Sequence, residues 1–105
     1  MNRIEQLKNM LSENPNDSFL KFALALENLK LGNEREAEKN FTEIIEHNPN
    51  YTGTYYHLGK LLERKGEKAK AETIYKTGIQ LTFGKEFHTH AELQNALNEL
   101  LYADD

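Results

Sequence analysis

The side chains of this chain best suited to binding zinc or transferring a proton near neutral pH are its four histidines. His88 and His90 stand two residues apart, a spacing that puts them on opposite sides of a helix. His47 and His57 add no spacing that would gather the three or four ligands of a zinc site. We interpret these histidines as surface residues near helix ends, and a small metal-binding protein stays a distant alternative.

The acidic residues do not form a catalytic arrangement either. Glu34, Glu36 and Glu38 fall at the start of a predicted helix, where carboxylates stabilise the positive end of the helix dipole. The sequence has no serine, histidine and acid in a positioned turn and no glycine-rich phosphate loop. It also has no cysteine, which excludes disulfides, thiolate ligands and a cysteine nucleophile. We therefore expect neither an enzyme nor a bound cofactor.

Charge and length narrow the possible partners. The 105 residues carry a net charge of −4, and no basic stripe is present that could neutralise phosphates. We expect no binding to nucleic acid or to a membrane. No apolar run approaches the ~20 residues that span a bilayer. The stretch from Met1 to Met10 lacks the apolar centre of a secretory signal. These features predict a cytoplasmic protein.

The dominant pattern is a repeat with a period of 34 residues. The tripeptide Asn14-Pro15-Asn16 returns as Asn48-Pro49-Asn50. Further pairs at the same separation are Leu24 and Leu58, Ala25 and Gly59, Gly32 and Gly66, Ala37 and Ala71, and Phe41 and Tyr75. A period of this size indicates one supersecondary unit copied along the chain, so it predicts a short solenoid.

Breaker residues set the helix boundaries. Pro15 and Pro49 each end a helix, while Gly32 and Gly66 are predicted left-handed helix C-termini. The run from Thr89 to Glu92 has the form of a capping box that starts the last helix. The apolar stripe of that helix consists of Leu93, Ala96, Leu97, Leu100 and Leu101. The predicted helices span 2–13, 18–31, 34–47, 52–65, 68–81 and 89–102.

The residues of the second full unit are those of a known repeat. Its pattern consists of Tyr55, Leu58, Gly59, Leu62, Gly66, Ala71, Tyr75 and Gly78. The first unit carries the same pattern at Leu24, Ala25, Gly32, Ala37, Phe41, Ile44 and Pro49. On these positions the chain resembles the tetratricopeptide repeat (TPR) family, whose units are 34-residue helix–turn–helix hairpins. Departures from the family pattern are Phe83, where proline is expected, and Lys21 and Asn28, at positions that are usually apolar.

The resemblance implies an all-α fold, a short right-handed α-solenoid of about six helices. It implies one domain over residues 1–105, made of an N-terminal half-repeat helix, two repeats and a C-terminal capping helix. The corresponding ranges are 2–13, 18–51, 52–85 and 89–102. As members of this family normally bind other proteins, the resemblance also implies a non-enzymatic protein–protein interaction module.

In this family the first helices of successive units line a concave groove, in which we expect a peptide or a short helix to bind. Helical spacing of ~100° per residue selects the side chains beside each core stripe. The candidates are Phe19, Phe22, Leu26, Leu29, Tyr56, Lys60, Glu63, Arg64, His90 and Gln94. One subgroup of the family holds the C-terminal carboxylate of chaperones with lysine, asparagine and arginine. Phe22, Leu26 and His57 stand at the matching positions, so that function is not expected.

Two other interpretations concern the apolar strip formed by Phe19, Phe22 and Leu26. The predicted helix 18–31 is apolar nearly all round, as buried helices are, and Lys21 and Asn28 suggest that it is rotated relative to the family's usual phase. The strip would then be core. Alternatively, an exposed apolar strip marks an interface, and the chain would self-associate as a homodimer through this strip, or through the uncovered side of the first predicted helix.

Overall fold

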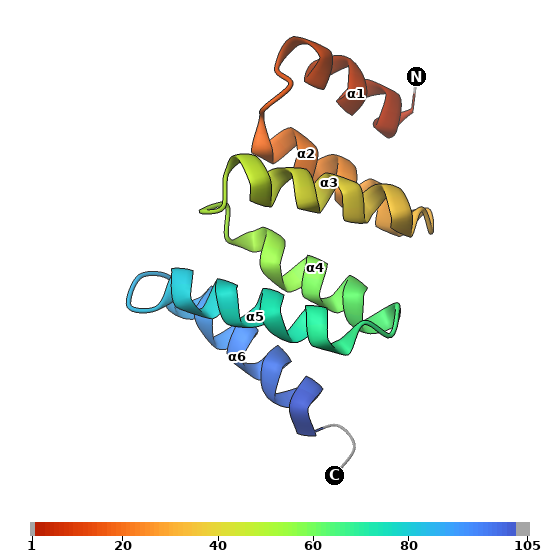
Figure 1. Ribbon diagram of the computed structural model, residues 1–105. Helices are drawn as coiled ribbons and strands as arrows, with labels where there is room; N and C mark the ends of the chain where they lie inside the picture. The colour runs from red at the N-terminus through yellow and green to blue at the C-terminus, as the bar shows by residue number, and fades with distance from the viewer. Residues whose placement is uncertain (1, 103–105) are drawn as a thin grey trace. The chain divides into compact units, whose positions relative to one another are not determined.

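The computed structural model describes residues 2–102, and every regular element in that range is a helix. The helices are α1 (Arg3–Glu13), α2 (Ser18–Lys30), α3 (Glu34–His47), α4 (Gly53–Arg64), α5 (Lys68–Thr82) and α6 (Phe87–Tyr102) (Figure 1). The predicted all-α class is confirmed. None of the described helices is both long enough and apolar enough to cross a bilayer.

The helices group into two compact units, with the division between Tyr51 and Thr52. Unit 1 holds α1, α2 and α3, and in it α2 packs against both α1 and α3. Unit 2 holds α4, α5 and α6, each of which packs against the other two. The prediction that all of this forms a single domain over 1–105 stays a prediction.

The first helix of each hairpin ends at a glycine, Gly32 after α2 and Gly66 after α4. Gly32 and Gly66 both have a φ of 80°, a left-handed conformation that glycine adopts without strain. Behind Gly32 the Asn33 N–H donates to the carbonyl of Asn28 at 2.8 Å. The Glu67 N–H donates to the carbonyl of Leu62 at 2.9 Å in the same way. These are Schellman motifs, so the predicted left-handed helix ends are confirmed.

The predicted start of the last helix is wrong. α6 begins at Phe87, two residues before Thr89, so Thr89 lies inside the first turn and cannot serve as the N-cap of a capping box. The His90 N–H already donates to the Glu86 carbonyl at 2.9 Å. The Glu86 carboxylate accepts a 2.6 Å hydrogen bond from the Thr52 hydroxyl at the start of α4. α6 therefore begins 34 residues after Gly53, where the repeat register places it.

The core of unit 1 contains polar residues in the ordinary phase of the repeat. Lys21, Leu24, Ala25 and Asn28 of α2 are all buried, at the i, i+3, i+4, i+7 spacing of one helix face. The suggestion that α2 is rotated is therefore wrong. The amide of Asn28 donates to Asn40 Oδ1 of α3 at 3.0 Å, which gives a partner to both buried side chains.

The core of unit 2 depends on two glycines that let helices approach. A Cβ added at Gly59 of α4 would lie 2.1 Å from Cε1 of Tyr75 on α5. A Cβ added at Gly78 of α5 would lie 2.8 Å from both Tyr55 of α4 and Leu93 of α6. The aromatic rings of unit 2 therefore occupy the space that glycine leaves open, and α6 packs directly onto α5.

The predicted apolar stripe of α6 is covered only in part. Leu93, Ala96 and Leu100 are buried. Leu97 is half-buried and Leu101 is 37% exposed. Of the five residues in the predicted stripe, Leu97 and Leu101 are therefore not fully covered by α4 and α5.

Candidate functional site

Two of the predicted side chains, Tyr56 and Lys60, lie on a face shared by α4 and α6 in unit 2. It is a groove of ≈ 190 Å³ between the two helices. We call it the α4–α6 face, and its residues are Tyr56, Lys60, Glu92, Asn95, Ala96 and Glu99. The four residues from α6 follow an i, i+3, i+4, i+7 spacing and thus share one side of that helix.

Lys60 contacts three other side chains at this face. Its Nζ lies 3.7 Å from Glu63 Oε2 and 3.7 Å from Glu99 Oε2. It also lies 5.7 Å from the centroid of the Tyr56 ring, within the range of a cation–π contact. The ion pairs are partly exposed, so each contributes little to stability. Together these contacts place a positive group near an aromatic ring and two carboxylates.

Two further side chains contact residues at this face, the buried Tyr75 and the half-buried His57. The hydroxyl of Tyr75 donates a hydrogen bond to the Glu63 carboxylate, which holds Glu63 at the edge of the face. Burial, together with this carboxylate, raises the pKa of Tyr75 above its usual range. The His57 ring meets the Tyr56 ring edge-on at 5.5 Å. Burial lowers the pKa of His57, and the charge of Glu92 opposes that effect.

The chemistry of this face suits binding. An aromatic ring, an amide, an ammonium group and carboxylates can contact the backbone and side chains of a peptide. Within residues 2–102, no three His, Asp or Glu side chains converge in the way that metal ligands do.

The four candidate residues in unit 1 differ in how far their side chains are buried. Phe22 lies with its ring centroid 6.0 Å from that of Phe41 and 5.6 Å from that of Tyr51, so its ring belongs to the packing of the unit. Leu26 and Leu29 are half-buried. Phe19 is 64% exposed and is the only one of the four with a largely free side chain.

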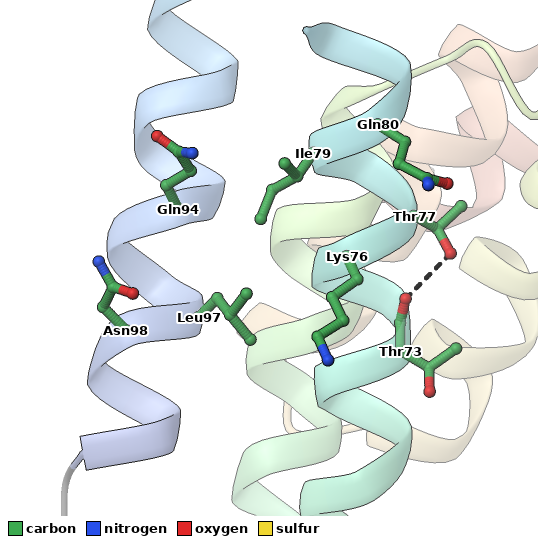
Figure 2. A pocket seen from close by; sticks show the side chains of 8 residues that line it. All are labelled: Thr73, Lys76, Thr77, Ile79, Gln80, Gln94, Leu97 and Asn98. Atoms are coloured by element: carbon green, nitrogen blue, oxygen red, sulfur yellow. Dashed lines mark hydrogen bonds between the residues drawn. The ribbon is translucent and has the colours of Figure 1, made fainter.

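The candidates in unit 2 are also divided. Tyr56, Lys60 and Glu63 lie close together, and Arg64 is exposed at the end of α4. His90 lies elsewhere, against the end of α5, with Nδ1 3.2 Å from the Ile79 carbonyl oxygen. Gln94 lines a different groove, which lies between α5 and α6 (Figure 2).

The prediction for α6 missed the residues that do lie beside Tyr56 and Lys60, which are Glu92, Asn95 and Glu99. It used on α6 the positions chosen on α4, one place after each core residue. Leu93 stands where α4 has Gly59, and its bulk packs onto Gly78. The missed residues could have been found from the buried stripe of α6, because each stands one position before a buried residue of that stripe, which consists of Leu93, Ala96 and Leu100.

Comparison with known proteins places the chain in a family. The family model for the tetratricopeptide repeat matches residues 52–83. The crystal structure of a tetratricopeptide repeat domain protein from Salinibacter ruber is 38% identical, with a TM-score of 0.80, and the match covers 84% of this chain and 100% of that one.

Two further proteins are similar. Antiviral innate immune response effector IFIT1 of Macaca fascicularis is 33% identical over 76 residues, or 72% of this chain, and this chain spans only 16% of its length. A TPR2B domain of yeast Sti1, solved in a complex with pHsp70, has a TM-score of 0.84 at 17% identity and covers 93% of this chain and 79% of its own. That likeness supports the fold alone. With the repeat register, the helical hairpins and the match over the whole Salinibacter domain, the chain belongs to the tetratricopeptide repeat family.

Proposed function

We propose that this chain is a non-enzymatic interaction module that binds an extended peptide or a short helix of another protein on the α4–α6 face. Family membership supports the general class, a protein–protein interaction module. The yeast Sti1 domain, which shares the fold, was solved with a bound protein partner. The observation that carries the proposal is the groove between α4 and α6, because its lining offers an aromatic ring, an amide and charges of both signs.

The size of the groove favours a peptide over a small molecule. Pockets for small ligands measure roughly 300–1,000 Å³, whereas this groove holds ≈ 190 Å³. That volume suits one or two side chains of a longer ligand that continues over the neighbouring surface. The Asn95 amide can donate to and accept from a peptide backbone, while Tyr56 offers its ring face. After the cost of ordering a flexible peptide, we expect a micromolar dissociation constant.

A peptide selection experiment tests this proposal. The full chain is immobilised, binders are selected from a random 12-residue peptide library, and the dissociation constants of the selected peptides are measured. The test variant is Asn95→Ala, and the matched control is Asn98→Ala. Both asparagines are exposed on α6, but Asn98 lines the groove against α5.

We expect Asn95→Ala to weaken the selected peptides about tenfold, the effect of one hydrogen bond of ~1–1.5 kcal/mol. Asn98→Ala should leave their binding unchanged. The proposal is rejected if no peptide binds, or if the two variants weaken binding equally.

The homodimer interpretation has less support. It used the strip of Phe19, Phe22 and Leu26, of which Phe22 packs against Phe41 and Leu26 is half-buried. Only Phe19 remains as a largely exposed ring, and one exposed phenylalanine is ordinary on a protein surface.

A further inference from the structure

The repeat register assigns each helix a place in a two-helix hairpin. α2 and α4 are first helices, and each packs against a second helix, α3 or α5. α6 begins 34 residues after α4, so it is a first helix. α1 ends at Glu13, 34 residues before the end of α3 at His47, so it is a second helix. Among the described residues, α6 has no second helix of its own and α1 has no first helix.

The surface of α6 that lacks such a helix forms a groove with α5. The α5–α6 groove has a volume of ≈ 580 Å³, the larger of the two grooves described in unit 2. Figure 2 shows Ile79 of α5 and Leu97 of α6 pointing into the space between the helices, with the amides of Gln94 and Asn98 along the edge. Leu101, 37% exposed, stands one turn beyond Leu97.

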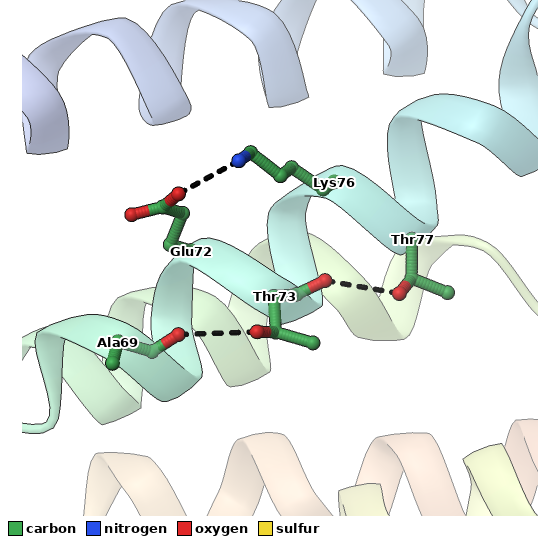
Figure 3. A network of polar contacts seen from close by, with 5 residues as sticks. All are labelled: Ala69, Glu72, Thr73, Lys76 and Thr77. Carbon is green, nitrogen blue, oxygen red and sulfur yellow. Dashed lines mark hydrogen bonds and ion pairs between the residues drawn. The ribbon is translucent and has the colours of Figure 1, made fainter.

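The α5 side of this groove presents few unsatisfied polar groups. The hydroxyl of Thr73 donates to the Ala69 carbonyl at 3.2 Å, and the hydroxyl of Thr77 donates to the Thr73 carbonyl at 2.9 Å (Figure 3). Lys76 is paired with Glu72 at 2.7 Å (Figure 3). Because the hydroxyl donors of Thr73 and Thr77 already have acceptors, an apolar helix face can cover them with little loss of hydrogen bonding.

The helix α1 presents an apolar face that its own unit covers incompletely. Leu7 is buried, but Met10 is 45% exposed, and Ile4 and Leu11 are half-buried. In the two complete hairpins, the residues at the place of Met10 are Ile44 and Gly78, and both are buried. α1 therefore lacks cover at the position where the other second helices have it.

The sizes of the side chains match between α1 and α6. In unit 2 a large residue of the first helix, Tyr55, packs against a small residue of the second helix, Gly78. The residues at these two places in α6 and α1 are Thr89 and Met10. The pair is reversed, with a small residue on the first helix and a large one on the second, so the combined volume is retained.

We propose that the α5–α6 groove is the docking site for α1 of a second copy of this chain, so that copies associate head to tail. In the contact, α1 completes the hairpin that α6 begins, and Met10 lies beside Thr89 while the apolar face of α1 covers Leu97. Because the two surfaces differ, the contact is heterologous, and repeated contacts give rings or open chains rather than a closed dimer. The proposal does not depend on the α4–α6 face, since Asn95 takes no part in it.

The test measures the mass of the full chain in solution over a concentration series, by light scattering or sedimentation. The variants are Met10→Glu on α1 and Leu97→Glu on α6, with Phe19→Glu as the control for another exposed apolar residue. Circular dichroism establishes that each variant is folded. We expect the wild type and Phe19→Glu to gain mass with concentration. Each of the other variants should raise the dissociation constant at least tenfold.

Mixing the two variants decides between head-to-tail and symmetric association. The Met10→Glu copy keeps an intact groove and the Leu97→Glu copy keeps an intact α1, so the mixture should form a dimer and nothing larger. Three results would overturn the proposal: a wild type that stays monomeric up to millimolar concentration, a mixture that stays monomeric, or loss of association in Phe19→Glu alone. The last result would instead support the homodimer through α2.

Discussion

The close approach of α4 and α5 makes Gly59 the most sensitive position of unit 2. In the substitution Gly59→Ala the new Cβ would lie 2.1 Å from Cε1 of Tyr75, whereas carbon atoms normally meet at about 3.5–4.0 Å. The ring cannot move away easily, because the Tyr75 hydroxyl is hydrogen-bonded to Glu63. Overpacking of this kind costs about 1–3 kcal/mol, and an overlap above 1 Å belongs to the upper end of that range.

Helix propensity acts in the opposite direction. Alanine inside a helix is favoured over glycine by about 1 kcal/mol, so the net loss from Gly59→Ala should be about 2 kcal/mol. For a domain of this size, that loss lowers the melting temperature by about 8–16 °C. Urea titration followed by circular dichroism measures the same change as a lower midpoint with an unchanged slope. A variant as stable as the wild type, or more stable, would refute this account of the packing.

Unit 1 supplies the control. It has Ala25 at the place of Gly59 and Phe41 at the place of Tyr75, so alanine is tolerated where the ring has no hydroxyl. The double variant Gly59→Ala with Tyr75→Phe should therefore cost less than the sum of the single variants, by about 1 kcal/mol. If the costs simply add, the hydrogen bond to Glu63 is not what holds the ring in place.

Three other predictions follow from particular contacts. Asn28→Ala should cost about 1–3 kcal/mol, because it leaves the buried Asn40 amide unpaired. Replacing both asparagines by the apolar residues found 34 positions later should be nearly neutral in the same urea titration. Phe22 is half-buried, so Phe22→Ala should lower stability by about 1–3 kcal/mol, whereas Phe19→Ala should change it by less than about 0.5 kcal/mol. His57 has a lowered pKa in the folded state, so the unfolded chain takes up a proton first as the pH falls. The contribution of neutral His57 to the free energy of unfolding is complete above the unfolded pKa of ~6.5 and is lost as the pH falls through the folded pKa. In a series of urea titrations at different pH values, His57→Asn should therefore show a smaller decrease in the free energy of unfolding toward low pH.

The repeat made most of the fold predictable. The turn glycines and the prolines of the period fix helix ends within two residues, because only a few residue types allow the required backbone. The start of α6 was misjudged because the local signal at Thr89 matched a cap, whereas the packing between hairpins decides where the helix begins. A cap contributes only about 1 kcal/mol, and the backbone hydrogen bond from the His90 N–H to the Glu86 carbonyl already extends the helix ahead of Thr89.

The site was harder to predict than the fold. Glu92 and Asn95 of α6 stand 34 positions after Leu58 and Leu61, which are buried in α4, so the repeat register assigned these two positions to the core. The polar residues of α2 misled in the opposite way. Lys21 and Asn28 suggested rotation, yet α2 keeps the family's phase because Asn40 on the facing helix provides Asn28 with a partner. The burial of an amide side chain can be predicted from a sequence only when its hydrogen-bond partner is known.

Each of the two hairpins has a side-chain hydrogen bond between its helices that involves a buried residue, but the residue types differ. Unit 1 pairs Asn28 with Asn40, and unit 2 pairs the Tyr75 hydroxyl with Glu63. Since each pair joins the two helices of one hairpin, a change in one unit leaves the hydrogen bonds of the other intact. Exposed positions such as Asn95 lie outside these pairs, so their substitution should alter binding while changing the free energy of unfolding by less than about 0.5 kcal/mol. In a fold of this kind, the residues that select a partner can therefore change without loss of the register that holds the helices together.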